Sequence, residues 1–383
     1  MKFLVTVFGA VFFLAACASS SKIEREAPSP LTDFAAERQV KSLWSSDSGA
    51  SVKNAIKLIP YFEANAIYTT YPRGRVRAYA TESGRALWKS RVKATVTGGA
   101  GGGEGLVVIT DDNGQAIAFN EADGQRRWVS QLSSQALAPA VVRAGVVVVQ
   151  TVDGKLTGLA AVDGKRLWVY ERSEPPLSLR GTSAPVVAGN IVLTGFASGK
   201  IAAVQISDGK FLWDIAIAEP RGRNEIERLV DVDVSPLVIQ NVLFAASYQG
   251  KLTAIDMQTG RIIWSRDLST YSGMDADEKN IYVTDDKGSV LALDQHTGAG
   301  VWRQEKLRAR ELTAPRCIDE FIAVGDFEGY VHWLSKEDGH FIARYRVSRG
   351  PIRAQAIAAA DTLYVATQSG VLAALRLEKS AAN

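Results

Sequence analysis

The chain has 383 residues, enough for two average domains or for one large β domain. Apolar residues make up 46% of it, which is ordinary for a folded protein and excludes a disordered chain. It carries 44 basic and 41 acidic residues without a run of lysine and arginine, so the composition gives no support to a nucleic-acid partner.

The N-terminus has the pattern of a secretory signal. One lysine precedes an apolar run at residues 3–14, which is too short to span a bilayer as a stable helix. The run leads into LAAC at residues 14–17, which resembles the bacterial lipobox, where the signal peptide is cleaved before a cysteine that becomes lipid-modified. An ordinary signal peptide with a chance cysteine is the alternative.

The lipobox resemblance implies three parts of the chain. Residues 1–16 are a lipoprotein signal peptide, residues 17–32 are a flexible tether with acyl chains on Cys17, and residues 33–383 are the folded domain. Several acyl chains hold a protein firmly at a membrane. Ala18 stands where many Gram-negative bacteria place the aspartate that retains lipoproteins at the inner membrane. The resemblance therefore implies a lipid anchor in the outer membrane, facing the periplasm.

The folded part is a tandem repeat. Eight segments have two glycines ten residues apart around a short alternating apolar strand, although the last copy ends in serine. Each glycine stands where a tight hairpin requires positive φ. The segments are residues 74–84, 114–124, 154–164, 199–209, 250–260, 288–298, 329–339 and 370–380.

A tryptophan follows the second glycine of six repeats by four residues. The seventh repeat has Ala343 at this place, which we expect to weaken one contact between repeats. A further tryptophan, in the segment VKSLW near the N-terminus, has no preceding strands of its own. We expect these side chains to fill the contacts between neighbouring sheets, because a buried large apolar side chain contributes roughly 1.5–3 kcal/mol. The seven are Trp44, Trp88, Trp128, Trp168, Trp213, Trp264 and Trp302.

The repeat predicts an all-β fold. Two more apolar runs precede each first glycine, so each unit has four antiparallel strands and a period near forty residues. This period is typical of a β-propeller. The last repeat ends before a tryptophan strand, and the strand of Trp44 supplies the missing one. The sequence therefore predicts an eight-bladed propeller in which the N-terminal strand joins the C-terminal blade and leaves no open edge.

Residues 254–264 and 292–302 resemble the tryptophan-docking repeat of pyrroloquinoline quinone (PQQ) dehydrogenases, and the resemblance covers residues 40–377. It implies the fold but not the activity. Those enzymes carry an adjacent cysteine pair against the quinone, whereas this chain has no such pair and keeps only Cys317 as a possible free thiol besides the lipidated Cys17. We expect Cys317 to lie buried and unreactive in a strand. The sequence predicts no enzyme and no cofactor; a small PQQ-binding quinoprotein or ligand-binding propeller is the alternative.

Other candidate sites lack the spacing that their chemistry requires. Asp231 and Asp233 are candidates for calcium ligands or for a catalytic carboxylate pair, but nothing around them resembles a ligand loop. His296, His332 and His340 do not have metal-ligand spacing. The glycine-rich segment 98–105 lacks a phosphate-loop register and reads as a flexible loop between blades. We therefore expect no metal site and no catalytic residue.

Two connections between repeats are longer than the rest. The second glycines are 40 residues apart at first, but 45 and 51 residues apart around insertions at residues 171–183 and 218–236. Insertions of a repeat protein gather on one face, often the binding face. Leu177, Leu179 and Arg180 in the first insertion have the composition of an interface anchor. Alternatively, the leucines pack under their own loop and Arg180 pairs with an aspartate of the second insertion.

The lipobox, the PQQ-type repeats and the segments LSLRG and RLVDVDVSP together resemble the BamB family of outer-membrane assembly lipoproteins. The resemblance implies a non-enzymatic scaffold of the β-barrel assembly machinery that docks on the periplasmic POTRA domains of BamA. It also implies that the contact residues are Leu177, Leu179, Arg180, Asp231 and Asp233. Nascent barrel proteins are a further candidate partner, because exposed strand edges can pair with extended chains.

Overall fold

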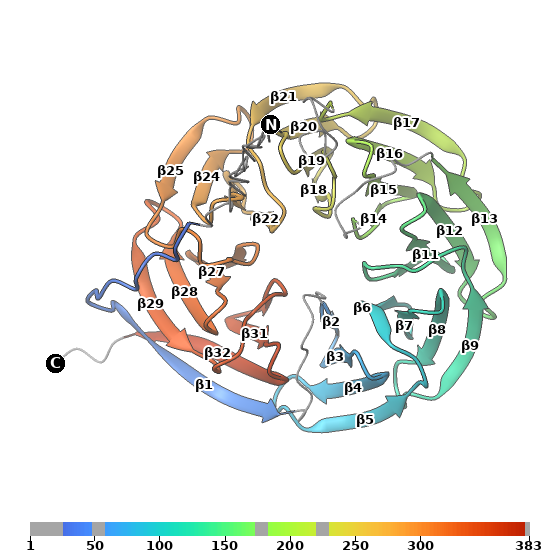
Figure 1. Cartoon of the computed structure of the whole chain (residues 1–383), viewed down its shortest axis with the longest axis horizontal. Helices are drawn as coiled ribbons and strands as arrows, with labels where there is room; N and C mark the ends of the chain where they lie inside the picture. Colours follow the sequence, from blue (N-terminus) through green and yellow to red (C-terminus); the bar gives the residue numbers. More distant parts are fainter. Residues whose placement is uncertain (1–25, 48–57, 173–182, 220–229, 380–383) are drawn as a thin grey trace, which may run out of the picture.

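The computed structural model describes residues 26–47, 58–172, 183–219 and 230–379, in which every regular element is a β-strand. The strands form six four-stranded sheets and one eight-stranded sheet. The sheets stand side by side in a ring (Figure 1). In most of them the first strand lies toward the centre and the last strand at the rim, whereas β1 lies at the rim of its sheet. No described residue belongs to a helix long and apolar enough to cross a membrane. The predicted all-β fold is confirmed.

In five of the seven sheets that the described residues form, the strands follow one another in chain order. Those before the first long connection are β1 (Arg38–Asp47), β2 (Tyr61–Glu63), β3 (Ala66–Tyr71), β4 (Arg75–Ala80), β5 (Ala86–Arg91), β6 (Val96–Gly103), β7 (Leu106–Asp111), β8 (Gln115–Asn120), β9 (Arg126–Gln131), β10 (Val141–Arg143), β11 (Val146–Gln150), β12 (Lys155–Ala160) and β13 (Arg166–Glu171). The middle strands are β14 (Val186–Ala188), β15 (Ile191–Gly195), β16 (Lys200–Gln205), β17 (Phe211–Ala216), β18 (Leu237–Ile239), β19 (Val242–Ala246), β20 (Lys251–Asp256) and β21 (Ile262–Asp267). The last are β22 (Gly273–Ala276), β23 (Asn280–Thr284), β24 (Val290–Asp294), β25 (Gly300–Gln304), β26 (Arg316–Ile318), β27 (Phe321–Gly325), β28 (Tyr330–Ser335), β29 (Phe341–Arg346), β30 (Ile357–Ala359), β31 (Thr362–Ala366) and β32 (Val371–Lys379).

One sheet contains strands from both ends of the described chain. Its order is β1-β32-β31-β30, and β1 pairs antiparallel with β32 from Arg38 opposite Lys379 to Asp47 opposite Val371. The N-terminal strand therefore pairs with the C-terminal one, as the position of Trp44 predicts (Figure 1).

Each tryptophan of the repeat bridges two successive repeats. Trp128 on β9 stands opposite the small residue Ala118, and its indole N–H donates to the carbonyl of Ala161 in the next repeat at 2.9 Å. Its ring lies over Gly164, whose φ is +73°. The same indole bond to the following repeat recurs for Trp44, Trp88, Trp168, Trp213, Trp264 and Trp302. The second glycine of a repeat is thus the place where the preceding repeat docks.

Replacing Gly164 with alanine tests this docking. A Cβ there would lie 2.6 Å from Cε3 of Trp128 and would also occupy a left-handed φ. We expect Gly164→Ala to lower the free energy of unfolding by about 2–4 kcal/mol, the sum of backbone strain and overpacking. Gly145→Ala is the matched control, because Gly145 has φ +72° and no atom within 4 Å of the added Cβ. Urea denaturation of both variants measures the difference, and equal losses would contradict the docking role.

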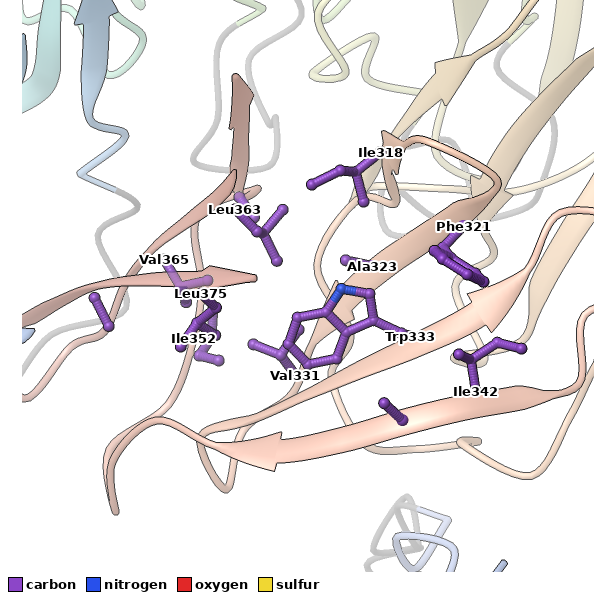
Figure 2. Close-up of a cluster of buried hydrophobic side chains, with 13 residues drawn as sticks. Ile318, Phe321, Ala323, Val331, Trp333, Ile342, Ile352, Leu363, Val365 and Leu375 are labelled. Atoms are coloured by element: carbon purple, nitrogen blue, oxygen red, sulfur yellow. The ribbon is translucent and has the colours of Figure 1, made fainter. Parts of the chain in front are cut away.

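The seventh repeat keeps its tryptophan on the neighbouring strand. Trp333 on β28 stands directly opposite Ala343 on β29, so the large and the small residue have exchanged strands. Trp333 is 1% exposed and packs with Leu363 and Leu375 of the last sheet (Figure 2). Trp333 fills the space that Ala343 leaves, from the inner strand, while the predicted weakening of this contact stays a prediction.

The glycine-rich segment 98–105 is not a loop between blades, as its composition suggested. Residues 96–103 form β6, the first strand of its repeat. Side chains at these glycines would collide with neighbouring backbone; a Cβ on Gly101 would overlap the carbonyl of Ala140. The missing side chains let β10 approach until Val141 pairs with Gly102 in parallel. This bridge joins two repeats into the eight-stranded sheet.

Candidate partner-binding site

The two long connections join β13 to β14 and β17 to β18, in neighbouring sheets (Figure 1). Their central parts, residues 173–182 and 220–229, lie outside the described residues. Leu177, Leu179 and Arg180 belong to the first of these parts, so their predicted contacts stay predictions. The ends of both connections are described and show how they are held.

The described ends of the two connections touch each other. The hydroxyl of Ser183 donates to the carbonyl of Val234 at 3.4 Å, and the backbone N–H of Ala184 donates to the hydroxyl of Ser235 at 3.2 Å. Ser183 is fully buried, whereas Ser235 is exposed. The prediction that the two insertions lie side by side is confirmed at these ends. Sequence reasoning missed both serines, which carry no pattern of their own.

Three buried valines attach the end of the second connection to the ring. Val230, Val232 and Val234 are each at most 4% exposed and alternate along the segment VDVDV. Val232 packs with the sheet of β14–β17, and Val234 packs with the sheet of β18–β21. A Cβ on Gly195 would overlap Val232, so this glycine makes room for the segment. The end of the connection is therefore fixed by burial of apolar side chains.

The two aspartates of this segment differ in exposure. Asp231 is 1% exposed, and its carbonyl accepts a hydrogen bond from the backbone N–H of Tyr248 at 3.0 Å. Asp233 is half-buried. For Asp231 to touch a partner directly, its carboxylate would have to move outward, whereas Asp233 reaches the surface without such a change.

The first connection begins at an ion pair that bridges two sheets. Arg172, just after β13, forms a salt bridge with Asp214 on β17, and Lys200 lies 3.4 Å from the same carboxylate. The guanidinium of Arg172 also donates to the hydroxyl of Tyr170 at 3.0 Å. These contacts tie the start of the first connection to the sheet from which the second one leaves. No sequence pattern predicts this pair, because its members are 42 residues apart.

The other candidates of the sequence do not assemble into a site. Among the described residues, no group of three histidine, cysteine or acidic side chains has metal-binding geometry. His332 is buried on β28 beside Asp326, while His340 is an exposed turn residue that contacts Asp338. Burial raises the pKa of the Cys317 thiol far above its ordinary value, and the nearby Asp275 carboxylate adds to the rise. A thiol in this setting is a poor nucleophile.

This chain is similar to known proteins along nearly its whole length. The family model described as outer membrane protein assembly factor BamB matches residues 72–304. An outer membrane protein assembly factor BamB from Alkalilimnicola ehrlichii is 44% identical over 374 residues, which cover 97% of this chain and 96% of that protein. This chain belongs to the BamB family. The crystal structure of BamB from Moraxella catarrhalis has the same fold, with a TM-score of 0.80 and 30% identity over 88% of this chain and 100% of that one.

Outside the BamB family, the fold recurs in an enzyme. A quinohemoprotein alcohol dehydrogenase from Pseudomonas putida matches with a TM-score of 0.70 but only 14% identity, over 90% of this chain and 77% of that one. A likeness at this identity shows the shared fold alone. It explains why the repeats resemble those of quinoprotein dehydrogenases and assigns no chemistry to this chain.

Proposed function

We propose that this protein is a non-enzymatic assembly factor for β-barrel proteins of the outer membrane. The proposal depends on one observation: the similarity to the BamB family extends along nearly the whole chain. The relatives in this family are named outer membrane protein assembly factors. The described residues offer a rigid ring with two long connections held together on it, which suits a scaffold that presents loops to another protein.

We infer a closed ring of eight four-stranded blades as the scaffold. The eight-stranded sheet counts as two blades, because a single parallel bridge between Val141 and Gly102 joins its halves. The eighth blade combines β1 with β30–β32, and Trp44 on β1 donates its indole N–H to the carbonyl of Thr81 in the first blade at 2.7 Å. Closure of this kind removes the exposed sheet edges of an open array.

The two long connections are the proposed docking site for the POTRA domains of BamA. Leu177, Leu179 and Arg180 supply the apolar anchor and its charge, and Asp233 lies at the surface of the neighbouring connection. Asp231 supports the site from below in this arrangement, because its side chain is buried. Contacts across the bases of the connections, such as Ser183 with Val234, keep the two loops adjacent.

Acyl chains on Cys17 would anchor the protein in the outer membrane on the periplasmic side, with residues 1–16 as the cleaved signal peptide. This part of the proposal depends on the lipobox resemblance and on Ala18 after the cysteine. Nascent barrel proteins are the proposed substrates, either handed on by the docked partner or bound at the rim of the ring.

Photocrosslinking in cells tests the docking site. A photoreactive residue at Leu179 is expected to give an adduct that contains BamA, identified by mass spectrometry, and Arg180→Ala is expected to weaken it about tenfold if the arginine is a hot spot. Val162 provides the matched control. It is 74% exposed and lies in the turn before β13, at the other end of that strand from the first long connection.

Adducts of equal yield from both positions would indicate contact by chance encounter and would contradict the proposed site. No adduct from Leu179, in a protein that is folded and membrane-bound, would return the leucines to packing within their own loop.

A further inference from the structure

Residues 26–37, here called the strap, run along the ring before β1 begins. Although the strap contains no regular element, it is bonded at both ends and in the middle to the sheet β26–β29 and to the connection between β25 and β26. At its start, the carboxylate of Glu26 accepts two hydrogen bonds from the guanidinium of Arg308, at 2.9 and 2.8 Å. At its end, the backbone N–H of Glu37 donates to the carbonyl of Ile342 on β29 at 3.0 Å.

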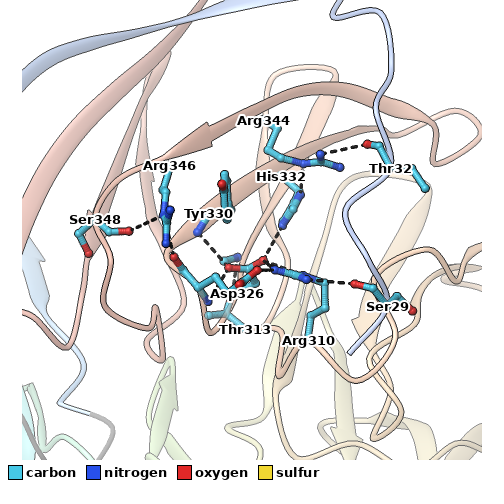
Figure 3. A network of polar contacts seen from close by, with 12 residues as sticks. Ser29, Thr32, Arg310, Thr313, Asp326, Tyr330, His332, Arg344, Arg346 and Ser348 are labelled. Atoms are coloured by element: carbon cyan, nitrogen blue, oxygen red, sulfur yellow. Dashed lines mark hydrogen bonds and ion pairs between the residues drawn. The ribbon is translucent and has the colours of Figure 1, made fainter. Parts of the chain in front are cut away.

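The middle of the strap is held by two arginines of the ring. Arg310, only 4% exposed as a side chain, donates to the carbonyl of Ser29 at 3.0 Å, and Arg344 donates to the carbonyl of Thr32 at 3.1 Å (Figure 3). Arg310 is itself fixed by Asp326, at 2.9 Å from its Nε. The donors are therefore already oriented before the strap binds, which lowers the entropic cost of binding it.

Apolar side chains of the strap complete the contact. Phe34 stacks on Phe341 with ring centroids 5.2 Å apart, and the guanidinium of Arg344 lies 5.0 Å from the Phe34 ring. Leu31 packs on the same buried cluster, which lies between the two sheets and includes Leu307 and Leu334. The strap thus belongs to the folded ring, whereas the sequence assigned most of it to a flexible tether.

Docking of the strap changes how far an anchor on Cys17 can reach. Nine residue steps separate Cys17 from Glu26, which span at most about 30 Å when fully extended. Without docking, the free chain would run to Arg38 and span at most about 70 Å. A folded chain of this length has a width of about 50 Å, judged from the radius of gyration expected for its residue count. With the strap docked, the chain between Cys17 and the ring is shorter than the protein is wide. Without docking, this chain is longer than the protein is wide.

We propose that the strap determines which side of the ring lies nearest the membrane, namely the side of β25 and β29. It does so by fixing the chain that follows the acylated Cys17 to the connection after β25. This inference depends on the acylation of Cys17 in the proposed function and adds an orientation to it. With the strap docked, the far side of the ring cannot reach the bilayer surface as closely as the strap side. Undocking of the strap would lengthen the free chain after Cys17 and let the whole protein rotate relative to the membrane.

Energy transfer to a labelled membrane tests the orientation. The full-length lipidated protein, with Cys317→Ser, is bound to phosphatidylethanolamine–phosphatidylglycerol vesicles that contain a headgroup acceptor dye. A donor dye is attached either at Lys306→Cys, beside the strap, or at Ser133→Cys, after β9 on the opposite side of the ring (Figure 1). We expect transfer from position 306 to exceed that from position 133 about twofold or more, given a ring about 50 Å wide.

Matched variants separate docking from anchoring. Leu31→Ser with Phe34→Ser is expected to bring the two transfer efficiencies together, whereas Ala35→Ser with Ala36→Ser, at exposed strap positions, is expected to leave the difference unchanged. Equal transfer from both sites in the otherwise unaltered strap would overturn the orientation while leaving the proposed function intact. A protein that fails to float with vesicles and lacks acyl mass on Cys17 would overturn the proposed lipid anchor. It would also overturn the proposed orientation, which depends on that anchor.

Discussion

Trp333→Ala is expected to lower the free energy of unfolding by about 3–5 kcal/mol, because it leaves a cavity between the last two sheets. Trp333 is 1% exposed and belongs to a cluster built from both sheets (Figure 2). Urea denaturation followed by circular dichroism measures the loss. A cost below about 1 kcal/mol would mean that the neighbouring side chains collapse into the space.

A second variant tests why the tryptophan of this repeat lies on β28 rather than on β29. In the other sheets the tryptophan rests on the turn glycine of the following sheet, as Trp302 rests on Gly339. The sheet that follows β29 has β1 as its outer strand, so no hairpin turn joins that strand to β32. A tryptophan at position 343 would therefore lack a docking glycine. We expect Trp333→Ala with Ala343→Trp to recover less than half of the lost stability, about 1–2 kcal/mol at most; full recovery would contradict this explanation.

Asp326→Ala is expected to destabilise the protein by about 3–5 kcal/mol, because it leaves the buried guanidinium of Arg310 with only the exposed carboxylate of Glu328 as a counter-charge. The Asp326 side chain is fully buried and also contacts Nε2 of His332 at 3.0 Å (Figure 3). Burial alone would raise the pKa of Asp326, but the hydrogen bond and charge of His332 hold it below its ordinary value. Loss of the carboxylate should also free Arg310 from the orientation in which it binds the strap.

Asp111→Ala is the matched control for this prediction. Both aspartates accept hydrogen bonds from the backbone N–H groups two and four residues onward, and both are fully buried. Asp111 shows no bond to an arginine among the described residues, so its replacement is expected to cost only about 1–2 kcal/mol for the turn. Equal costs in denaturation experiments would mean that the ion pair with Arg310 adds nothing to stability.

The repeat could be predicted from the sequence because its signals are local. Glycines such as Gly164 stand where a hairpin requires positive φ, and a tryptophan follows at a fixed distance. Trp333 was missed because the pattern was sought on one strand, whereas packing depends on the pair of strands. The sequence contains eight tryptophans, and the eighth was the available clue. Composition alone predicts a loop for the glycine-rich segment 98–105, because the close approach of its strand to β10 depends on a distant part of the chain.

The site was less accessible to sequence reasoning than the fold. The lengths of the two connections predicted their position in the chain, and the contact between Ser183 and Val234 places their ends together. The alternation of valines in this segment treats Asp231 and Asp233 alike, so periodicity alone does not show that Asp231 is the buried one. The strap was hidden for the same reason, since Arg310 and Arg344 lie about 280 to 310 residues beyond their strap partners.

The pairing of β1 with β32 has a consequence for the order of folding. Arg38 and Lys379 meet across this pair, so the contact with nearly the largest sequence separation in the chain must form before the sheet is complete. Such contacts form slowly, because the chain loses the entropy of closing a long loop before the contact stabilises it. During synthesis, β1 waits unpaired until the last strand exists. A chain that is cut short keeps an unsatisfied strand at each end, which gives proteases and chaperones a ready means of recognising unfinished molecules.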